Sequence, residues 1–354
     1  MKGPGRIVIC GAGVIGAAIA QALGSRGAAS TVIDRVGVAP GASGKAGGFL
    51  ALDWNDQSAV GPLARRSFAL HRELSATLAA DYGYRTVETV MVAGRHPRFG
   101  EEPHSNGQPE WLDGNVAVQG VMGTHTTTAQ LNPKLFTKAL VADAESRGAE
   151  VLTGRVDAVR HDGSVNGVVV DGDLVPADVV VAALGPWTGS IGLPLPRVDA
   201  YKGSSIVLAA DVPPQAVFSD FIAEAGIRLA PEIYPRDGEV YVTGAPSADP
   251  LPESADQVTA DLADCDLLHA VAAGHSSKLA SAGIVRRQAC FRPVTADGLP
   301  LIGAVRDMPG VFVATGHGPW GILNAPATGE MVAEMILDGA ASSVDASPFS
   351  PFRR

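Results

Sequence analysis

The stretch RIVICGAGVIGAAIAQALGSRGAASTVID spans residues 6–34 and reads as strand, tight turn, helix and second strand. Residues 7–10 form a short apolar run that predicts the first strand, and an alanine-rich helix follows to about Arg26. Residues 31–33 predict the second strand, which Asp34 closes. This order is typical of the first unit of a Rossmann-type domain.

Three glycines follow the first strand at the spacing G-x-G-x-x-G. Gly11 permits the tight turn, Gly13 lets the backbone approach a pyrophosphate, and Gly16 allows the helix to pack closely on the strand. Val14 and Ile15 begin the helix, whose free N–H groups attract phosphate. We therefore assign all five residues to a dinucleotide site.

An acidic residue, Asp34, stands at the end of the second predicted strand, where its carboxylate can accept hydrogen bonds from ribose hydroxyls. Arg35 follows it and joins the predicted site, although one arginine is weak support for a 2′-phosphate. The alternative is a glycine-rich turn without a ligand, which the strand, helix and acid in correct order disfavour. The fingerprint alone does not distinguish FAD from NAD.

Composition excludes several classes of partner. The chain has 354 residues, 46% of them apolar, and a formal net charge of -10. Nucleic acids and anionic membranes need basic surfaces, so we expect neither as a partner. The beginning of the sequence does not read as a signal peptide, and no apolar run is long enough to span a bilayer, so we expect a cytoplasmic protein.

The three cysteines, Cys10, Cys265 and Cys290, have no paired spacing, which disfavours a disulfide framework or a zinc site. The eight histidines show no metal-ligand spacing either, and we predict no metal.

Further along the chain, apolar periodicity and turn residues predict helices and strands in alternation. A helix over about 58–80 and a strand over 87–92 precede a polar excursion rich in Pro and Gly, residues 95–115, which we interpret as a loop. Asn132-Pro133 begins a helix that ends near Gly148. The later predictions are strands over 150–153, 167–170, 178–182, 205–209, 239–243, 284–292 and 311–314, and helices over 258–273 and from about 321 to 337.

The dinucleotide fingerprint does not run on as successive βα units. It breaks into a second glycine-rich loop, GASGKAGG at 41–48, and the nucleotide-binding pattern resumes much later. The fold class predicted is therefore α/β: a Rossmann-type nucleotide-binding domain with an inserted α+β substrate domain on a mixed or antiparallel sheet. The expected boundaries are 1–56, 129–198 and 283–354 for the nucleotide-binding domain, which the resemblance given next implies to be FAD-binding, and 57–128 and 199–282 for the substrate domain.

The sequence resembles the D-amino-acid oxidase superfamily, which includes glycine oxidase and monomeric sarcosine oxidase. The resemblance spans nearly the whole chain and keeps the family order. It rests on residues 11–16 and on GASGKAGG (41–48), LNPKLFTKAL (131–140), DVVVAALGPW (178–187), YKGSS (201–205), FRPVTADGLPLIG (291–303) and VFVATGHGPWGILNAPATGEMVAEMI (311–336).

The resemblance implies FAD as the cofactor and assigns most of its contacts. Near the pyrophosphate and flavin it implies Ser43, Gly44, Lys45, Gly47 and Gly48, and at the adenine it implies Val156. In the cofactor cleft it implies Gly185 and Trp187. At the pyrimidine end of the flavin it implies Gly316, His317, Gly318, Gly321 and Ile322. The last turn precedes a helix whose N–H groups can stabilise the anionic reduced flavin.

The resemblance also implies the reaction: hydride leaves the carbon next to nitrogen in a small carboxylate-bearing amine for flavin N5, giving an imine and, with O2, hydrogen peroxide. Arg292 matches the arginine that binds the substrate carboxylate, although a structural role at a strand end is the alternative. We name Tyr234 and Lys202 as further catalytic candidates, Tyr234 lining the pocket and Lys202 facing the flavin or, alternatively, solvent. Arg236 and Trp54 are candidates for the cavity wall; the alternatives are a turn residue for Arg236 and core packing for Trp54.

Cys290 stands where sarcosine-oxidase-like enzymes bond a cysteine to the flavin, so the FAD is either covalent through this residue or held without a covalent bond. The alternative is a small buried apolar side chain. The pattern is mixed, because sarcosine oxidases lack the arginine at 292 and have a lysine where this chain has Trp320.

Three functional alternatives follow from the sequence. An amine or amino-acid oxidase is the leading hypothesis, a flavin dehydrogenase with an acceptor other than O2 is the second, and a flavin-bound assembly factor without turnover is the third. An NAD-only dehydrogenase would lack flavin altogether. The sequence leaves the amine, its stereochemistry and the oligomeric state open.

Overall fold

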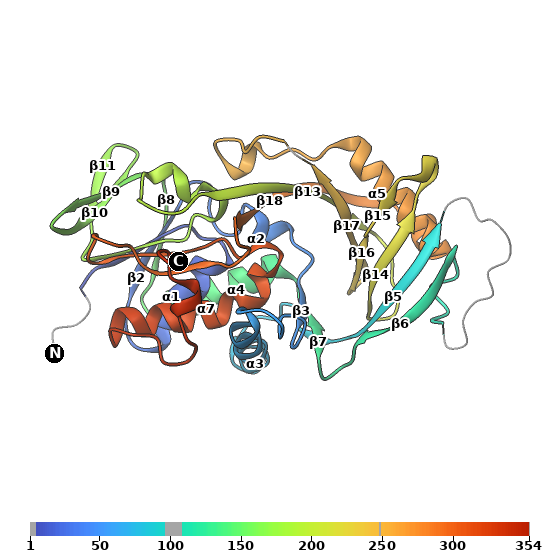
Figure 1. Ribbon diagram of the computed structural model, residues 1–354, viewed down its shortest axis with the longest axis horizontal. Coiled ribbons are helices and arrows are strands. Elements are labelled where there is room, and N and C mark those ends of the chain that lie inside the picture. Colours follow the sequence, from blue (N-terminus) through green and yellow to red (C-terminus); the bar gives the residue numbers. More distant parts are fainter. Residues whose placement is uncertain (1–4, 96–107, 248, 354) are drawn as a thin grey trace.

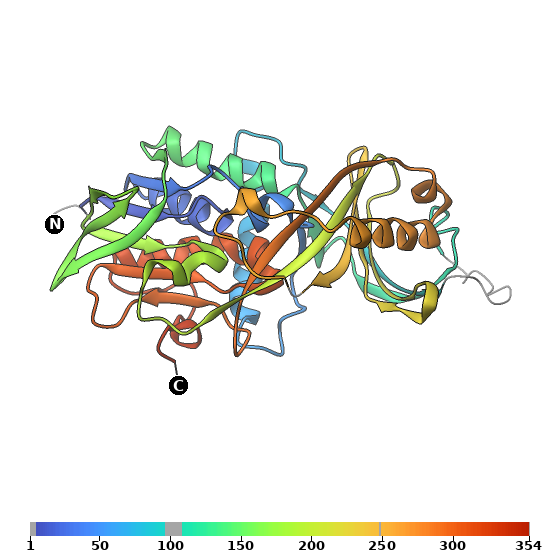
Figure 2. The ribbon, with the colours of Figure 1, turned by 90° about the horizontal axis from the view of Figure 1, so that it is seen from above.

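The computed structural model describes residues 5–95, 108–247 and 249–353, and these form two neighbouring lobes along the long axis of the molecule (Figure 1). One lobe contains a six-stranded sheet with helices against it, and the other contains an eight-stranded sheet. The long paired strands β13 and β18 run from the first lobe into the second (Figure 2). The fold is therefore mixed α/β, as the sequence predicts.

The six-stranded sheet has the order β19-β20-β12-β1-β2-β8, parallel except for its edge strand β19. Its strands are β1 (Ile7–Cys10), β2 (Ser30–Asp34), β8 (Glu150–Thr153), β12 (Val179–Ala182), β19 (Leu301–Ala304) and β20 (Val311–Thr315). All four residues of β1 are buried. Ile7 and Ile9 belong to the core on the helical side, whereas Val8 and Cys10 belong to the core on the opposite face. A central strand covered on both faces explains the continuous apolar run.

Helices cover one face of this sheet, and a small antiparallel sheet packs on the other (Figure 1). The helices are α1 (Val14–Ser25), α3 (Gly61–Thr77), α4 (Pro133–Ser146) and α7 (Gly321–Leu337). The small sheet consists of β9 (Val156–Asp162), β10 (Ser164–Val170) and β11 (Asp173–Pro176). Asn132 caps α4, because its side chain accepts from the N–H groups of Lys134 and Leu135 at 3.1 and 3.2 Å.

The eight-stranded sheet has the order β18-β13-β17-β16-β14-β5-β6, with β15 paired to β14, and only the β14–β5 pair is parallel. Its strands are β5 (Glu88–Arg95), β6 (Val116–Gly123), β13 (Val198–Leu208), β14 (Gln215–Ile222), β15 (Arg228–Leu229), β16 (Glu232–Arg236), β17 (Glu239–Ser247) and β18 (Ile284–Thr295). Helix α5 (Leu262–His275) covers one face, and the short α6 (Ser277–Ala280) follows it. The other face turns toward the first lobe.

The remaining elements are short. They are α2 (Ala42–Lys45), a three-stranded sheet of β3 (Phe49–Ala51), β7 (Thr128–Gln130) and β4 (Arg85–Thr86), and 3-10 turns η1 (Gly185–Ile191), η2 (Glu224–Gly226), η3 (Ala255–Gln257), η4 (Gly318–Trp320) and η5 (Ser347–Phe349). Sequence periodicity does not predict β3, β4 and β7, because two or three residues are too few to show a period.

Some predicted elements end at different residues in the structure. The helix predicted over 58–80 begins at Gly61 and ends at Thr77, and the one over 258–273 runs from Leu262 to His275. Of the excursion at 95–115, residues 96–107 lie outside the described residues. Its remaining part is not merely a polar loop, because Trp111 and Leu112 are 3% and 0% exposed and pack in the core beneath the eight-stranded sheet.

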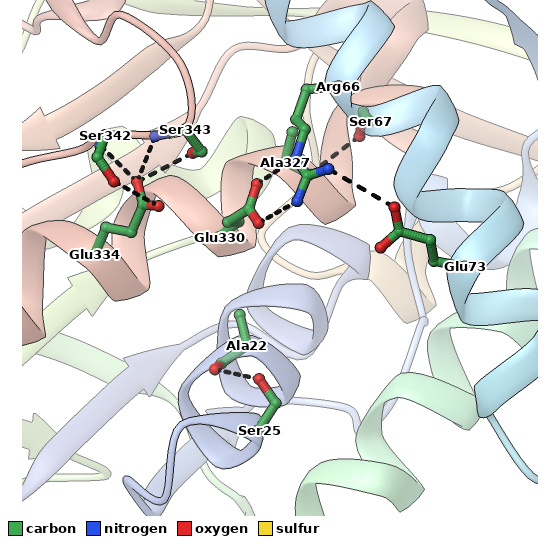
Figure 3. A network of polar contacts seen from close by, with 10 residues as sticks. All are labelled: Ala22, Ser25, Arg66, Ser67, Glu73, Ala327, Glu330, Glu334, Ser342 and Ser343. Atoms are coloured by element: carbon green, nitrogen blue, oxygen red, sulfur yellow. Dashed lines mark hydrogen bonds and ion pairs between the residues drawn. The ribbon is translucent and has the colours of Figure 1, made fainter.

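Helix α3 lies within 57–128, the range expected to belong to the substrate domain, but it packs against α7 of the first lobe. Arg66 donates to both carboxylate oxygens of Glu330, at 2.8 and 2.6 Å, and Ser67 Oγ accepts from the N–H of Ala327 at 3.1 Å (Figure 3). Leu63 belongs to the core shared with α1 and α7. We therefore propose that the first lobe includes α3.

A second contact from α3 replaces a hydrogen bond that α7 lacks at Pro326. Pro326 lies inside α7 and has no N–H to donate to the carbonyl of Ile322. His71 Nε2 lies 3.0 Å from that carbonyl and 3.1 Å from the carbonyl of Leu323, and it replaces the missing donor. The start of α7 is thereby fixed in place.

We expect stability to fall as the pH drops from about 6.5 to 4. Burial lowers the pKa of His71 and of His275 from 6.5 to about 4. The unfolded chain then binds more protons than the folded chain in this window, so each histidine reduces the free energy of unfolding by about 1.4 kcal/mol per pH unit. Urea unfolding at pH values from 7 to 4.5 measures how the free energy of unfolding changes with pH. In H71Q this slope should be smaller by the contribution of one proton. An identical slope in H71Q would contradict this assignment.

Candidate active site

A cavity of about 620 Å³ lies between the two lobes, and its volume is in the range of small-molecule and cofactor sites. The turn after β1, the loop containing α2, the turn before α7 and the exposed face of the eight-stranded sheet all line it. Most of the predicted site residues line this cavity, namely Gly11, Gly13, Val14, Ile15, Asp34, Arg35, Ser43, Gly47, Gly48, Val156, Gly185, Trp187, Tyr234, Cys290, Arg292, His317, Gly318, Gly321 and Ile322.

The fingerprint glycines have different roles in the structure. A Cβ on Gly16 would lie 1.9 Å from the carbonyl oxygen of Gly11, so this glycine is required where α1 packs on β1. Gly11 has φ +109°, and a Cβ there would lie 2.4 Å from the carbonyl oxygen of Ala183. At Gly13 the nearest atom to a Cβ is Ser43 Oγ, at 3.2 Å, and the residue faces the cavity. The protein's own packing therefore does not require Gly13 to be glycine.

Hydrogen bonds to Asp34 and Ser43 hold two segments around the helix N-terminus. Asp34 accepts from the N–H of Ala12 at 2.9 Å and from the N–H groups of Val36 and Gly37 at 2.9 and 3.1 Å. Ser43 Oγ accepts from the N–H of Val14 at 2.8 Å. The fingerprint turn and the second glycine loop thus meet at one end of the cavity. Arg35 lies beside them and donates to the carbonyl of Glu253 at 3.0 Å.

The second glycine loop is shaped by close contacts. A Cβ on Gly48 would lie 2.0 Å from the carbonyl oxygen of Leu131, and one on Gly44 would lie 2.2 Å from that of Ala39. A Cβ on Gly47 would lie 2.4 Å from the Tyr234 ring, so this glycine lets the sheet approach the loop.

Gly16, Gly44, Lys45 and Gly316 are predicted site residues that do not line the cavity. Gly16 and Gly44 instead permit backbone packing, and Gly316 has φ +78° at the start of the turn. Lys45 is half-buried, and its charge partly opposes the rise that burial causes in the pKa of the Cys290 thiol.

The turn before α7 places a buried histidine against the cavity. His317 is 5% exposed, and its Nε2 lies 3.0 Å from Thr328 Oγ1, whereas Nδ1 has no hydrogen-bond partner within the described part of the chain. Burial lowers the pKa of His317 to about 3, so the ring is neutral at pH 7. Gly318 follows with φ +56° and no atom within 4 Å of its Cβ position.

The eight-stranded sheet presents Arg292 and Cys290 to the cavity from β18. Arg292 is half-buried, and its guanidinium has no hydrogen-bond or ion-pair partner among the residues that the structure describes. Cys290 is 8% exposed, and burial raises the pKa of its thiol, while the positive charges of Arg292 and Lys45 partly oppose that shift. An arginine without a protein partner in a cavity wall is suited to binding an anionic ligand.

Lys202 lies on the opposite face of this sheet, which corrects the expectation that it faces the flavin. Its neighbour Gly203 lines the cavity, and successive residues of a strand point to opposite faces. Lys202 is buried, and its ammonium group forms an ion pair with Asp249. It is therefore not a catalytic candidate.

Aromatic side chains form the remaining walls. The Tyr234 ring stacks on Phe49 with centroids 5.4 Å apart, and its other face meets Tyr241 at 6.0 Å. Arg236 lies 5.0 Å above the Tyr241 ring and donates to the carbonyls of Ala46 and Gly47, so it ties the sheet to the second glycine loop. Other aromatic residues at the cavity are Trp54, Phe218 and Trp320.

Sequence reasoning missed several cavity residues of the sheet, among them Glu232 and Thr243. Their positions on β16 and β17 pair with each other in the register. Glu232 could have been predicted from the sequence. It lies two residues before Tyr234 on one strand, and residues two apart on a strand share a face.

The chain matches the DAO family, described as FAD dependent oxidoreductase, over residues 6–335. It is 29% identical to an oxidoreductase of Schizosaccharomyces pombe over 99% of both chains, and 28% identical to a glycine oxidase of Geobacillus kaustophilus over 97% of this chain and 96% of the other. The crystal structure of glycine oxidase from Geobacillus kaustophilus superimposes with a TM-score of 0.83 at 25% identity, covering 99% of each chain.

The chain therefore belongs to the DAO family of FAD-dependent oxidoreductases. Within it, the chain is an enzyme of the amino-acid-oxidase type. Among the described residues, no helix is both long and apolar enough to cross a membrane, and no group of three or more His, Cys, Asp or Glu side chains could hold a metal ion.

The cavity residues fit FAD on three observations. A Cβ on Gly13 would meet only Ser43 Oγ, at 3.2 Å, so its backbone faces the cavity beside the N-terminus of α1, where a pyrophosphate would approach the helix. The buried Nδ1 of His317 lacks a protein partner and belongs to a residue that lines the cavity. Gly185 and Gly318 both have positive φ and no atom within 4 Å of a Cβ position, so ligand atoms can approach their backbone.

Proposed function

We propose that this protein oxidises the C–N bond of a small carboxylate-bearing amine or amino acid, with O2 as the electron acceptor. The supporting observation is Arg292, a guanidinium without a partner among the described residues, on the wall of the same cavity as the fingerprint turn. A bidentate fork of N–H donors matches a carboxylate in geometry and charge. Glycine oxidase activity in a relative is consistent with such a substrate.

The fingerprint end of the cavity would hold the ADP part of FAD. Gly11, Gly13 and the first turn of α1 would meet the pyrophosphate, and Asp34 and Val156 would lie at the adenosine. Gly318, Gly321 and the N-terminus of α7 would meet the pyrimidine end of the flavin, where helix N–H groups favour a negative charge. When bound, FAD supplies the hydride acceptor.

The chain's own residues then have three tasks. Arg292 binds and orients the carboxylate, so that the adjacent C–H bond has a defined position. The aromatic walls around Tyr234 and Trp54 exclude water from the reacting centre. His317 stays neutral and can accept or donate one hydrogen bond at Nδ1 without adding a charge.

The test is anaerobic mixing of the FAD-loaded protein with a panel of small amino acids and N-methyl amino acids. We expect flavin bleaching with at least one of them and stoichiometric hydrogen peroxide when air is admitted. If an artificial electron acceptor reoxidises the bleached flavin but O2 does not, the protein is a dehydrogenase. Absence of bleaching with every amine, in a protein whose flavin is reduced by light, would favour an assembly factor without turnover.

We further propose that any covalent flavin bond forms at Cys290. Cys290 is the cysteine that lines the cavity, whereas Cys10 and Cys265 lie in the cores of the two lobes. Acid precipitation is expected to leave yellow flavin in the pellet of the wild type and in the supernatant of C290A. C265A serves as the control and should behave as the wild type. A yellow supernatant from the wild type would exclude the bond.

A further inference from the structure

Two charged side chains from the eight-stranded sheet line the cavity, Arg292 on β18 and Glu232 on β16. The other charged cavity residues are Asp34, Arg35, Arg155, Asp157 and Glu253, which belong to other segments. Asp34 and Arg35 lie at the fingerprint end, and Arg155 is paired with Asp157 at 2.5 Å. The wall proposed to bind substrate thus has one positive and one negative group.

The Glu232 carboxylate is held in a fixed position. It is half-buried, and its Oε2 accepts from the Tyr234 hydroxyl at 2.6 Å. Tyr234 is itself fixed by its stacking on Phe49 and Tyr241. A carboxylate has about four lone-pair sites, so this one hydrogen bond leaves acceptor capacity for a ligand. No cation within the described ranges forms an ion pair with it.

Arg292 and Glu232 do not pair with each other, although both act on one phenol. The Glu232 carboxylate accepts from the Tyr234 hydroxyl. Burial, and then the charge of Glu232, raise the pKa of that hydroxyl, and the charge of Arg292 partly opposes the shift. Strands β13 and β17 separate β18 from β16 in the sheet, and they present only Gly203, Thr243 and Tyr241 to the cavity. The small residues Gly203 and Thr243 thus lie on the strands between the two charged residues.

We propose that Glu232 binds the ammonium group of a zwitterionic substrate whose carboxylate is bound by Arg292. This inference rests on the proposed function and adds the substrate class: an amino acid with one carboxylate that binds with a protonated nitrogen. The nitrogen must then lose one proton, to the Glu232 carboxylate that it contacts or to water, before hydride can leave the adjacent carbon. Opposite charges attract more strongly in a site partly withdrawn from water. A second carboxylate near Glu232 would be repelled, so dicarboxylates bind poorly.

The test uses two dead-end ligands of nearly the same shape with the FAD-loaded protein. Trimethylammonioacetate carries a carboxylate and a permanent cation, and 3,3-dimethylbutanoate replaces the charged nitrogen by carbon. Neither can form an imine. Titration monitored by the flavin absorbance spectrum should give a dissociation constant at least about tenfold lower for the zwitterion in the wild type, as expected for a partly desolvated charge pair.

The variant E232Q keeps an acceptor for the Tyr234 hydroxyl but removes the charge, and we expect it to bring the two dissociation constants to within about twofold. The control E239Q removes a carboxylate of the same sheet that does not line the cavity, where it pairs with Arg286, and should retain the preference for the zwitterion. Malonate should bind more tightly to E232Q than to the wild type.

Equal affinity of the two ligands in the wild type, or a preference that persists in E232Q, would overturn the role of Glu232. Failure of both ligands to bind would overturn it as well. The same ligands test Arg292 independently of Glu232. If 3,3-dimethylbutanoate binds the wild type but not R292M, Arg292 binds the carboxylate, whatever the result for Glu232.

Discussion

R292M should lower kcat/KM by about 30- to 5,000-fold, measured with the amine that reduces the wild-type flavin. This is the range expected when one partner of a buried charge pair is removed. The methionine keeps the length of the side chain and removes the charge. Because Arg292 has no hydrogen bond or ion pair to any described residue, its loss breaks no internal polar contact among them. Flavin content and urea midpoint should therefore match those of the wild type. Anaerobic flavin reduction at varied amine concentration gives the rate and the apparent dissociation constant.

R292K and R287M are the matched comparisons. R292K keeps the charge but loses the planar fork, so it should fall between the wild type and R292M. Arg287 lies on the same strand, where it donates to exposed Asp266 at 3.1 Å, and R287M should change kcat/KM by less than about twofold, as surface pairs contribute little. Unchanged kinetics in R292M would mean that the substrate carboxylate binds elsewhere.

G13A should retain its fold and lose most of its affinity for FAD. The added Cβ would lie 3.2 Å from Ser43 Oγ, which a small side-chain shift relieves. It would also occupy the space where a pyrophosphate approaches the helix N-terminus, and overpacking by one methyl group costs about 1–3 kcal/mol, or about 5- to 150-fold in affinity. Flavin content per chain and FAD titration of the apoprotein measure the loss.

Two other glycines separate cofactor binding from folding. G16A places a Cβ 1.9 Å from the carbonyl oxygen of Gly11 and should prevent soluble folding. Gly120 has open space around it and no positive φ, so G120A should bind FAD as the wild type does. If G13A bound FAD with wild-type affinity, the pyrophosphate would not lie at this turn.

Local patterns predict much of the first lobe. The bounds of β1 and β8 agree with the sequence prediction, and α4 begins at Pro133 after the Asn132 cap. These elements depend on interactions between neighbours along the chain: apolar runs, a capping side chain and glycines in turns. The prediction of an α/β fold and of a family that binds FAD follows from them and from the motifs that recur in order.

Pairing between distant strands determined which side chains share the cavity. Lys202 and Gly203 are neighbours in the sequence, yet only Gly203 faces the cavity, because the register of β13 against β17 and β18 fixes the orientation of its faces. A shift of one residue would exchange the two. The sequence alone shows that side chains of a strand alternate between two faces, but it does not show which set faces the cavity.

Long-range contacts likewise decided the role of α3. His71 and Ser67 appear in the sequence as ordinary polar residues of an amphipathic helix, but both contact α7 near Pro326. No local pattern links residues more than 250 positions apart.

The fingerprint at 6–34, the second glycine loop and the family motifs are local, so the sequence by itself determined the nucleotide-binding lobe and the kind of cofactor that this family uses. Only the tertiary structure brought Glu232 and Arg292 to one wall and placed Lys202 on the other face. The reason is physical: the direction in which a strand residue points depends on which strand it pairs with, and that choice is made by the packing of the whole sheet.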